Sequence, residues 1–142
     1  MTYALRTTVD QPFARTLDAT RTALGENGFG VLTEVDLADV LRTRTGAKIP
    51  PQVILGACRP PLALAAVRVE PSIGLLLPCN VVVRALADGE TLVEVIDPAV
   101  MVTLTANPDL EDVALDARER LTAALVSLDG TLMEPGSASA GG

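Results

Sequence analysis

The sequence predicts an α+β domain in which a mainly antiparallel sheet of about five strands carries helices on one face. Two observations lead to this prediction. Segments rich in Val, Thr and Leu alternate with segments whose apolar residues recur at helical spacing, and a hairpin signal late in the chain joins two apolar segments. The chain has 142 residues, 49% of them hydrophobic, so it can build one domain with a core of its own.

The first half of the chain is expected to hold three strands and two helices. The strands lie at residues 3–9, 29–35 and 53–58. Asp10 as N-cap ahead of Pro12 predicts a first helix, which ends at Gly28. Asp36 begins a second, short helix, which Gly46 closes.

The middle of the chain adds a third helix and two longer strands. Pro60 permits the helix to start, and the pair Glu70-Pro71 ends it. The strands are expected at residues 75–85 and 91–96, because an Asp88-Gly89 turn between two apolar segments is a strong hairpin signal.

The clearest helix is expected near the C-terminus. Asn107 is placed to cap it and Pro108 to occupy its first turn, and its apolar residues then keep a period close to 3.6 until Gly130. Residues 131–142 end in SASAGG and are expected to form a disordered tail. The folded domain is therefore predicted to span residues 1–130.

The expected strand at residues 75–85 is apolar at both alternating positions, as its segments LLL and VVV show. A sheet with helices on one face needs apolar residues at only one of the two positions. The second face must therefore be covered by something else. Self-association is the simplest cover, and a ligand pocket is the alternative.

The composition argues against several classes of protein. Histidine is absent, which removes the commonest general base and the commonest zinc ligand, and two cysteines cannot complete a cysteine-rich zinc site. The net charge of −7, without a basic cluster, disfavours nucleic acid and an anionic membrane surface. Aromatic residues make up only 2% of the chain, so a flavin ring or a base would find little to stack on. We expect no metal, no cofactor, no nucleic acid and no membrane partner.

The same sequence features predict a cytoplasmic protein. The first residues, MTYALRTTVDQPF, lack the apolar core of a signal peptide, and no apolar run is long enough to cross a bilayer. Two cysteines without a secretion signal indicate reduced thiols.

Four segments, taken in their order and spacing, resemble the bacterial and archaeal family called the domain of unknown function 302 family. They are GFGVLTEVD at residues 28–36, GACRPPLA at 56–63, LLPCNVVV at 76–83 and IDP at 96–98. The resemblance extends over about residues 1–130. It implies a curved antiparallel sheet with helices on one side, similar to half of the TATA-binding protein, and a dimer. It supplies no catalytic residues, and Arg59 stands where relatives often have Asn.

Two cysteines and a neighbouring arginine are candidates for a functional site. Cys58 and Cys79 come from two expected strands and could lie close in space. As a reactive pair they would carry out redox or sulfur chemistry, with Arg59 favouring the thiolate. As buried small side chains they would be inert, and their apolar neighbours favour this second interpretation.

Asn80 and Asp97 complete the set of ligand-binding candidates. Pro78 interrupts a strand and requires a bulge or an edge position there, and bulges gather near binding sites. Asn80 follows it and offers both a donor and an acceptor. Asp97, at the end of an apolar strand, could act as an acid or base, although an Asp-Pro pair more often forms a turn. No catalytic residue is assigned.

Three functions remain open from the sequence, in this order. The first is a homodimeric binding protein that encloses a small apolar or acid-bearing molecule near Cys58, Cys79, Asn80 and Asp97. The second is a thiol-dependent redox or sulfur-handling enzyme that uses Cys58 or Cys79. The third is a dimer that serves only protein interaction.

Overall fold

The computed structural model describes residues 3–87, 89–128 and 131–133. Six antiparallel strands form one sheet in the order β2-β3-β4-β5-β1-β6. The strands are β1 (Ala4–Val9), β2 (Gly30–Asp36), β3 (Gln52–Cys58), β4 (Cys79–Ala85), β5 (Thr91–Ile96) and β6 (Thr131–Met133). The predicted α+β class and antiparallel sheet are confirmed.

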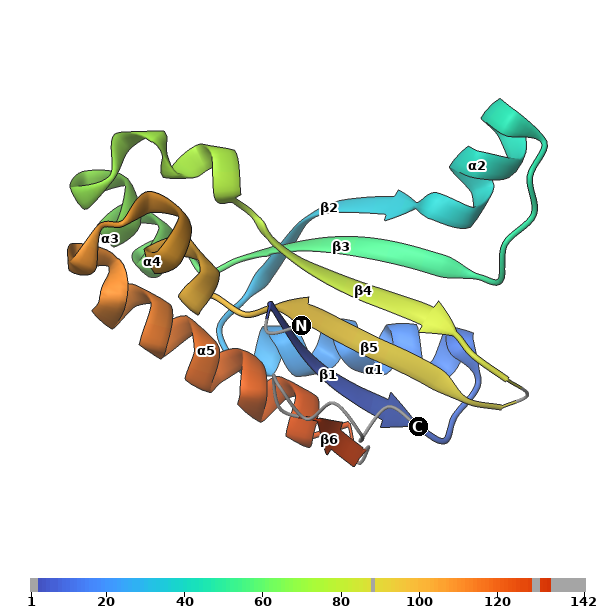
Figure 1. Ribbon diagram of the computed structural model, residues 1–142. Coiled ribbons are helices and arrows are strands. Elements are labelled where there is room, and N and C mark those ends of the chain that lie inside the picture. Colours follow the sequence, from blue (N-terminus) through green and yellow to red (C-terminus); the bar gives the residue numbers. More distant parts are fainter. Residues whose placement is uncertain (1–2, 88, 129–130, 134–142) are drawn as a thin grey trace.

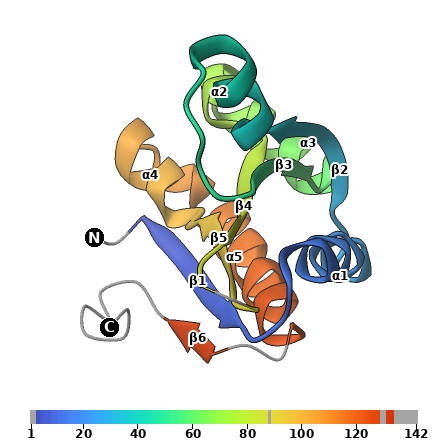
Figure 2. The same cartoon turned by 90° about the vertical axis from the view of Figure 1, so that its right-hand side faces the viewer.

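Within the described residues, five α-helices and two short 3₁₀ helices connect these strands. They are α1 (Phe13–Glu26), α2 (Leu37–Thr45), α3 (Pro60–Val69), η1 (Pro71–Leu76), α4 (Ala99–Thr105), η2 (Pro108–Leu110) and α5 (Glu111–Val126). The two long helices, α1 and α5, lie side by side against one face of the sheet (Figures 1 and 2). The helix η1 and α4 stand together at one end of the sheet, and α2 lies at the far end of β2 (Figure 1).

The core lies between the sheet and the pair α1 and α5. Alternate residues of the central strands point into it, as strand geometry requires. Leu5, Leu55, Val81, Val93 and Leu121 are all at most 2% exposed. A second cluster around Ile73, Met101 and Leu110 joins η1, α4 and the start of α5.

Several local signals in the sequence act as predicted. The Asp36 carboxylate accepts a hydrogen bond from the Asp39 amide at 3.0 Å and caps α2, and Gly46 ends that helix at a φ of 75°. The Asn107 side chain accepts from the Asp109 amide at 2.9 Å, at the turn that leads into α5. The predicted cap at Asp10 is wrong, because Pro12 stands at the N-cap of α1 and makes no side-chain cap there.

The predicted strand at residues 75–85 is correct only in its second part. Residues 71–76 form η1 instead, and the strand begins at Cys79, directly after Pro78. The Leu77–Pro78 peptide is cis. Because Pro78 has no amide hydrogen to donate to a ladder, it lies just before the strand and no bulge inside β4 is needed.

Two further elements were not predicted. The helix α4 occupies the apolar segment AVMVTLT between Pro98 and the cap of the next helix. Residues 131–133, expected in the disordered tail, form β6 and pair with β1. The remainder of the expected tail, and Gly130, lie outside the described residues, as does Asp88 of the predicted turn.

The sheet face opposite α1 and α5 is mixed in character. Ile54 and Val82 face each other across β3 and β4, and Glu94 lies beside Val82 on β5. The Glu94 carboxylate pairs with Arg6 at 2.9 Å and with Arg84 at 3.4 Å. The sequence predicts apolar residues at both alternating positions of residues 75–85. The segment LLL at residues 75–77 lies outside the strand, and Val81 and Val83 are buried in the core, so Val82 alone of the segment VVV reaches the second face.

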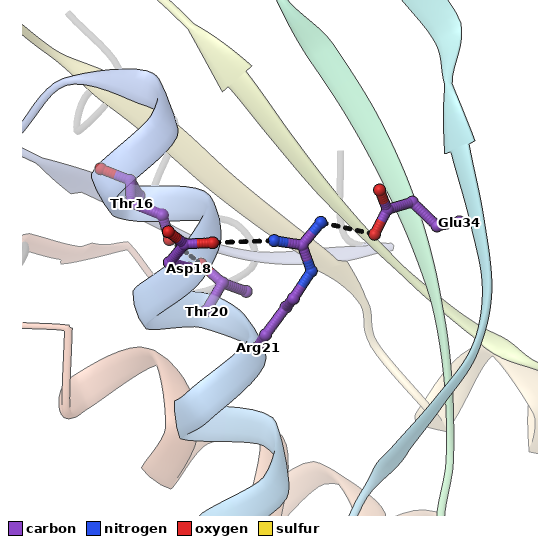
Figure 3. A network of polar contacts seen from close by, with 5 residues as sticks. All are labelled: Thr16, Asp18, Thr20, Arg21 and Glu34. Atoms are coloured by element: carbon purple, nitrogen blue, oxygen red, sulfur yellow. Dashed lines mark hydrogen bonds and ion pairs between the residues drawn. The ribbon is translucent and has the colours of Figure 1, made fainter.

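Besides its pairing with β3, the edge strand β2 is linked to α1 through Arg21. Arg21 of α1 contacts Asp18 at 2.9 Å and Glu34 of β2 at 2.6 Å (Figure 3). The hydrogen bond to Glu34 raises the pKa of Arg21 above its ordinary value. Thr20 donates to the Thr16 carbonyl at 2.7 Å in the turn before it. Beyond this contact, β2 leaves the layer formed by α1 and α5.

Candidate functional site

A cleft lies at the end of the sheet, and we call it the end cleft. It has a volume of about 440 Å³ and opens between η1 and α4, over the first residues of β1 and β4 and the last residues of β5. Its size is within the range typical of small-molecule sites. Most of the residues that line it are apolar, among them Leu76, Leu77, Val82, Val100 and Met101.

Three polar side chains line the end cleft. Asn80 is exposed on β4 and offers an amide donor and an amide oxygen. Tyr3 is about half exposed at the rim. Glu94 lies on the floor, where its charge is balanced by the two arginines that pair with it. The cleft therefore presents an apolar body with polar groups at its floor and edges.

The two sequence motifs GACRP and LPCN meet beside the end cleft. Gly56 of β3 lies opposite Asn80 of β4. A Cβ on Gly56 would overlap the Thr33 hydroxyl and approach Pro78 Cγ to 2.8 Å. Glycine is required at this position because a side chain of β2 and the proline ring both pack onto its backbone. This contact fixes the position of Pro78, and hence of the segment that forms one wall of the cleft.

The sequence-predicted candidates divide between two places. Cys79 and Asn80 line the end cleft. Cys58, Arg59 and Cys79 line a second, smaller hollow of about 30 Å³ between α3 and α5. Cys79 therefore separates the two cavities, as do Leu77 and Met101. Asp97 lines neither of them.

The two cysteines are neighbours and are both free thiols. Ala57 lies opposite Cys79 in the sheet, which brings Cys58 next to Cys79. Burial, and then the adjacent Cys58, raise the pKa of the Cys79 thiol to about 11. At neutral pH Cys79 is protonated, which is the inert form of a thiol.

Arg59 stands at the N-cap of α3 and faces the backbone of Gly28. Its Nε is buried and has no hydrogen-bond partner within residues 3–87, 89–128 and 131–133. The guanidinium group of Arg120 also approaches Gly28, and Arg120 is paired with Asp116 at 2.6 Å. Two guanidinium groups beside one another do not form an acid–base pair for catalysis.

Asp97 is buried and has structural partners. Its Oδ1 accepts from the Ala99 amide at 3.0 Å, at the first turn of α4, and its Oδ2 lies 3.4 Å from Arg118 Nε. The carboxylate is 8% exposed and lines neither cavity. The turn-forming interpretation of Asp97 fits this geometry better than the catalytic one.

Several residues of the end cleft were missed from the sequence because α4 was missed. Val100, Met101 and Leu104 come from that helix. A segment of seven residues without charge, bounded by Asp-Pro and Asn-Pro, was the available signal. The pairing of Glu94 with Arg6 and Arg84 depends on how β5 is aligned with β1 and β4, and this alignment could not be predicted from the sequence.

The described residues form neither a metal-binding cluster nor a membrane-spanning helix. No three His, Cys, Asp or Glu side chains of the described chain come together as a metal site would require. None of the described helices has the length and apolar character needed to cross a bilayer.

Comparisons with known proteins agree with this architecture. The model of the family Domain of unknown function DUF302 matches residues 5–128. A crystal structure of an uncharacterized conserved protein DUF302 from Bacillus stearothermophilus superposes with a TM-score of 0.81 at 28% sequence identity, covering 89% of this chain and 98% of that one. No curated protein matches the chain. The family match includes every residue that lines the end cleft except Tyr3 and Ala4.

Proposed function

The chain belongs to the family Domain of unknown function DUF302, and we propose that it is a cytoplasmic homodimer that binds a small, mainly aliphatic molecule in the end cleft. The observation that carries the proposal is the cleft itself: about 440 Å³, apolar walls from η1 and α4, and Asn80 at its edge. Apolar area removed from water supplies affinity, and a few placed polar groups supply orientation.

The chemistry of the lining indicates the class of molecule. Tyr3 is the one aromatic residue in the lining and lies at the rim, so flat aromatic rings gain little stacking. Leu, Val, Ile and Met side chains suit flexible aliphatic groups. Asn80 can bind either a hydroxyl group or a carbonyl group, because an amide both donates and accepts. A ligand with an aliphatic body and one polar end matches these features.

The thiol-dependent alternative has less support. The raised pKa of Cys79 keeps its sulfur protonated, and neither cysteine has a histidine to activate it, because the chain contains none. Two neighbouring free thiols do fit the reducing cytoplasm.

A series of straight-chain alcohols tests the proposal. Each added methylene group contributes about 0.8 kcal/mol when buried, so we expect the dissociation constant to fall about fourfold per carbon until the cleft is full and then to level off. Isothermal titration of the purified chain from hexanol to dodecanol measures this. Constant affinity along the series would contradict an apolar cleft.

A matched pair of variants locates the binding. Val82→Trp fills the floor of the end cleft and is expected to abolish the response to decanol. Val67→Trp, at an exposed position of α3 outside the lining, should bind decanol as the unchanged protein does. Equal loss or equal retention in the two variants would place the binding elsewhere. Native mass spectrometry of protein from its own host would then show which molecule is retained.

A further inference from the structure

The segment formed by β2, α2 and the loop to residue 51, which we call the arm, is poorly covered by the rest of the chain. All seven residues of β2 are exposed, and α2 has no buried residue. Leu32 is 65% exposed, and Val35 and Val40 are each 42% exposed. Figure 1 shows β2 and α2 extending away from α1 and α5.

An arm of this kind is unfavourable for a single copy in water. A nine-residue helix is marginal without an apolar face packed against another element. The strand β2 is an edge of the sheet, and its register with β3 shifts between Val31 and Thr33, so that Leu32 lies outside the regular ladder. A bulge of this kind disfavours pairing of the strand edge with another chain, so the exposed apolar side chains are the groups that a partner would cover. Exposed apolar residues gathered on one element mark an interaction surface.

The charge of the arm indicates which partner covers it. It contains three carboxylates, Glu34, Asp36 and Asp39, and three cations, Arg42, Arg44 and Lys48. The rest of the chain holds the other 15 of 18 carboxylates and 8 of 11 cations, so it carries the whole net charge of −7. Two copies repel each other least where their surfaces are neutral, and the arm is such a surface.

The charges are also ordered along the arm. The carboxylates Asp36 and Asp39 lie at the start of α2, and Arg42 and Arg44 lie in its last turn. Asp39 and Arg42 already pair within the helix, and a shallow hollow of about 370 Å³ beside α2 is lined by charges of both signs. A second copy related by a two-fold axis perpendicular to α2 places its helix antiparallel, so each acidic end meets a basic end.

We propose that the arm is the surface through which two copies of this chain associate, with the two α2 helices antiparallel and Leu32, Val35 and Val40 covered. This inference rests on the homodimer in the proposed function and specifies where and how it forms. A partner protein whose surface carries charge mainly of one sign would not complement the arm, because the arm is neutral overall and carries charges of both signs.

Sedimentation velocity of the full chain at micromolar concentration tests the surface with an apolar pair of variants. Leu32→Glu is expected to weaken dimerisation at least about tenfold, because it places a charge in the contact. Leu115→Glu is the matched control, since Leu115 is 56% exposed on α5, outside the arm and the cleft, and it should leave the dimer unchanged. Circular dichroism checks that both variants are folded.

A charge exchange tests whether the two α2 helices face each other in the dimer. The variant Asp36→Asn with Asp39→Lys keeps the helix cap and makes the helix ends positive, whereas Arg42→Glu with Arg44→Glu makes them negative. Each variant alone should be mainly monomeric because its own helices repel, and an equimolar mixture should recover the dimer. Recovery on mixing cannot come from misfolded protein.

The outcomes separate the two proposals. A monomeric unchanged protein contradicts both the homodimer and the arm surface. A dimer that survives Leu32→Glu contradicts the arm surface and leaves the homodimer standing. Loss of the dimer in Leu32→Glu without recovery in the mixed charge variants contradicts the contact between the two α2 helices.

Discussion

The body of the domain and its arm are built from the same kinds of residues but differ in what covers them. In the body, β1, β4 and β5 alternate core residues with residues of the second face, and α1 and α5 cover the core side. In the arm, β2 and α2 have comparable Val and Leu content, yet none of their residues is buried. Apolar composition therefore identifies the elements, whereas the position in the sheet decides which of them depend on a partner.

The largest expected effect is the difference in stability between a leucine truncated in the body and a leucine truncated in the arm. Leu55 of β3 is fully buried under α1 and α5, so Leu55→Ala is expected to lower the free energy of unfolding by about 2–5 kcal/mol. Leu32→Ala in the arm should change the stability of the monomer by less than about 0.5 kcal/mol. Urea unfolding at high dilution measures both. Similar losses in the two variants would mean that the arm is part of the monomer core.

The buried thiol should make stability depend on pH. The pKa of Cys79 is raised from 9.0 to about 11 in the folded protein, so unfolding releases a proton between these values. The protonated Cys79 thiol makes its full contribution to the free energy of unfolding below about pH 9. This contribution falls by roughly 2–3 kcal/mol as the pH rises to 11. Unfolding of the native chain and of Cys79→Ala, compared at pH 8 and pH 11, isolates this term. A constant difference between the two proteins would contradict it.

Disturbing the contact between Gly56 of the GACRP motif and Pro78 of the LPCN motif should lower the free energy of unfolding slightly less. Gly56→Ala places a methyl group against the Thr33 hydroxyl and Pro78, which we expect to destabilise the fold by about 1–3 kcal/mol. Gly74→Ala is the control, because a Cβ there has no atom within 4 Å. Thermal unfolding measures both. Adding Thr33→Ala to Gly56→Ala should recover part of the loss, and no recovery would show that the overlap is not its cause.

The smallest effect is expected for the ion pair between Arg21 of the body and Glu34 of the arm. Arg21→Ala removes the ion pair with Glu34, and because such pairs at the surface are weak we expect a loss of only about 0.2–1 kcal/mol. The loss should shrink further in high salt, since the pair is partly exposed. Chemical denaturation at low and high ionic strength provides the measurement. A loss that does not respond to salt would indicate packing of the Arg21 side chain instead.

The sequence by itself determined those elements whose signals are local. The cap at Asp36, the glycine that ends α2, the Asn107 turn before α5 and the strand at residues 91–96 all depend on neighbours within a few positions. Such signals act through the backbone and short side chains, so they can be interpreted from the chain alone. The four sequence segments also indicated the family without the structure, and the family match over residues 5–128 confirms it.

Only the tertiary structure decided what depends on distant contacts. The start of β4 after Pro78, the packing of Gly56 against Thr33 and the position of Glu94 between two arginines all require the register of three or four strands. The end cleft requires α4, an apolar segment that could equally have extended a strand. The arm is exposed because the helix layer ends before β2, and no local pattern records where a layer ends. Burial is a property of the assembled sheet and helices, whereas caps and turns are properties of short segments.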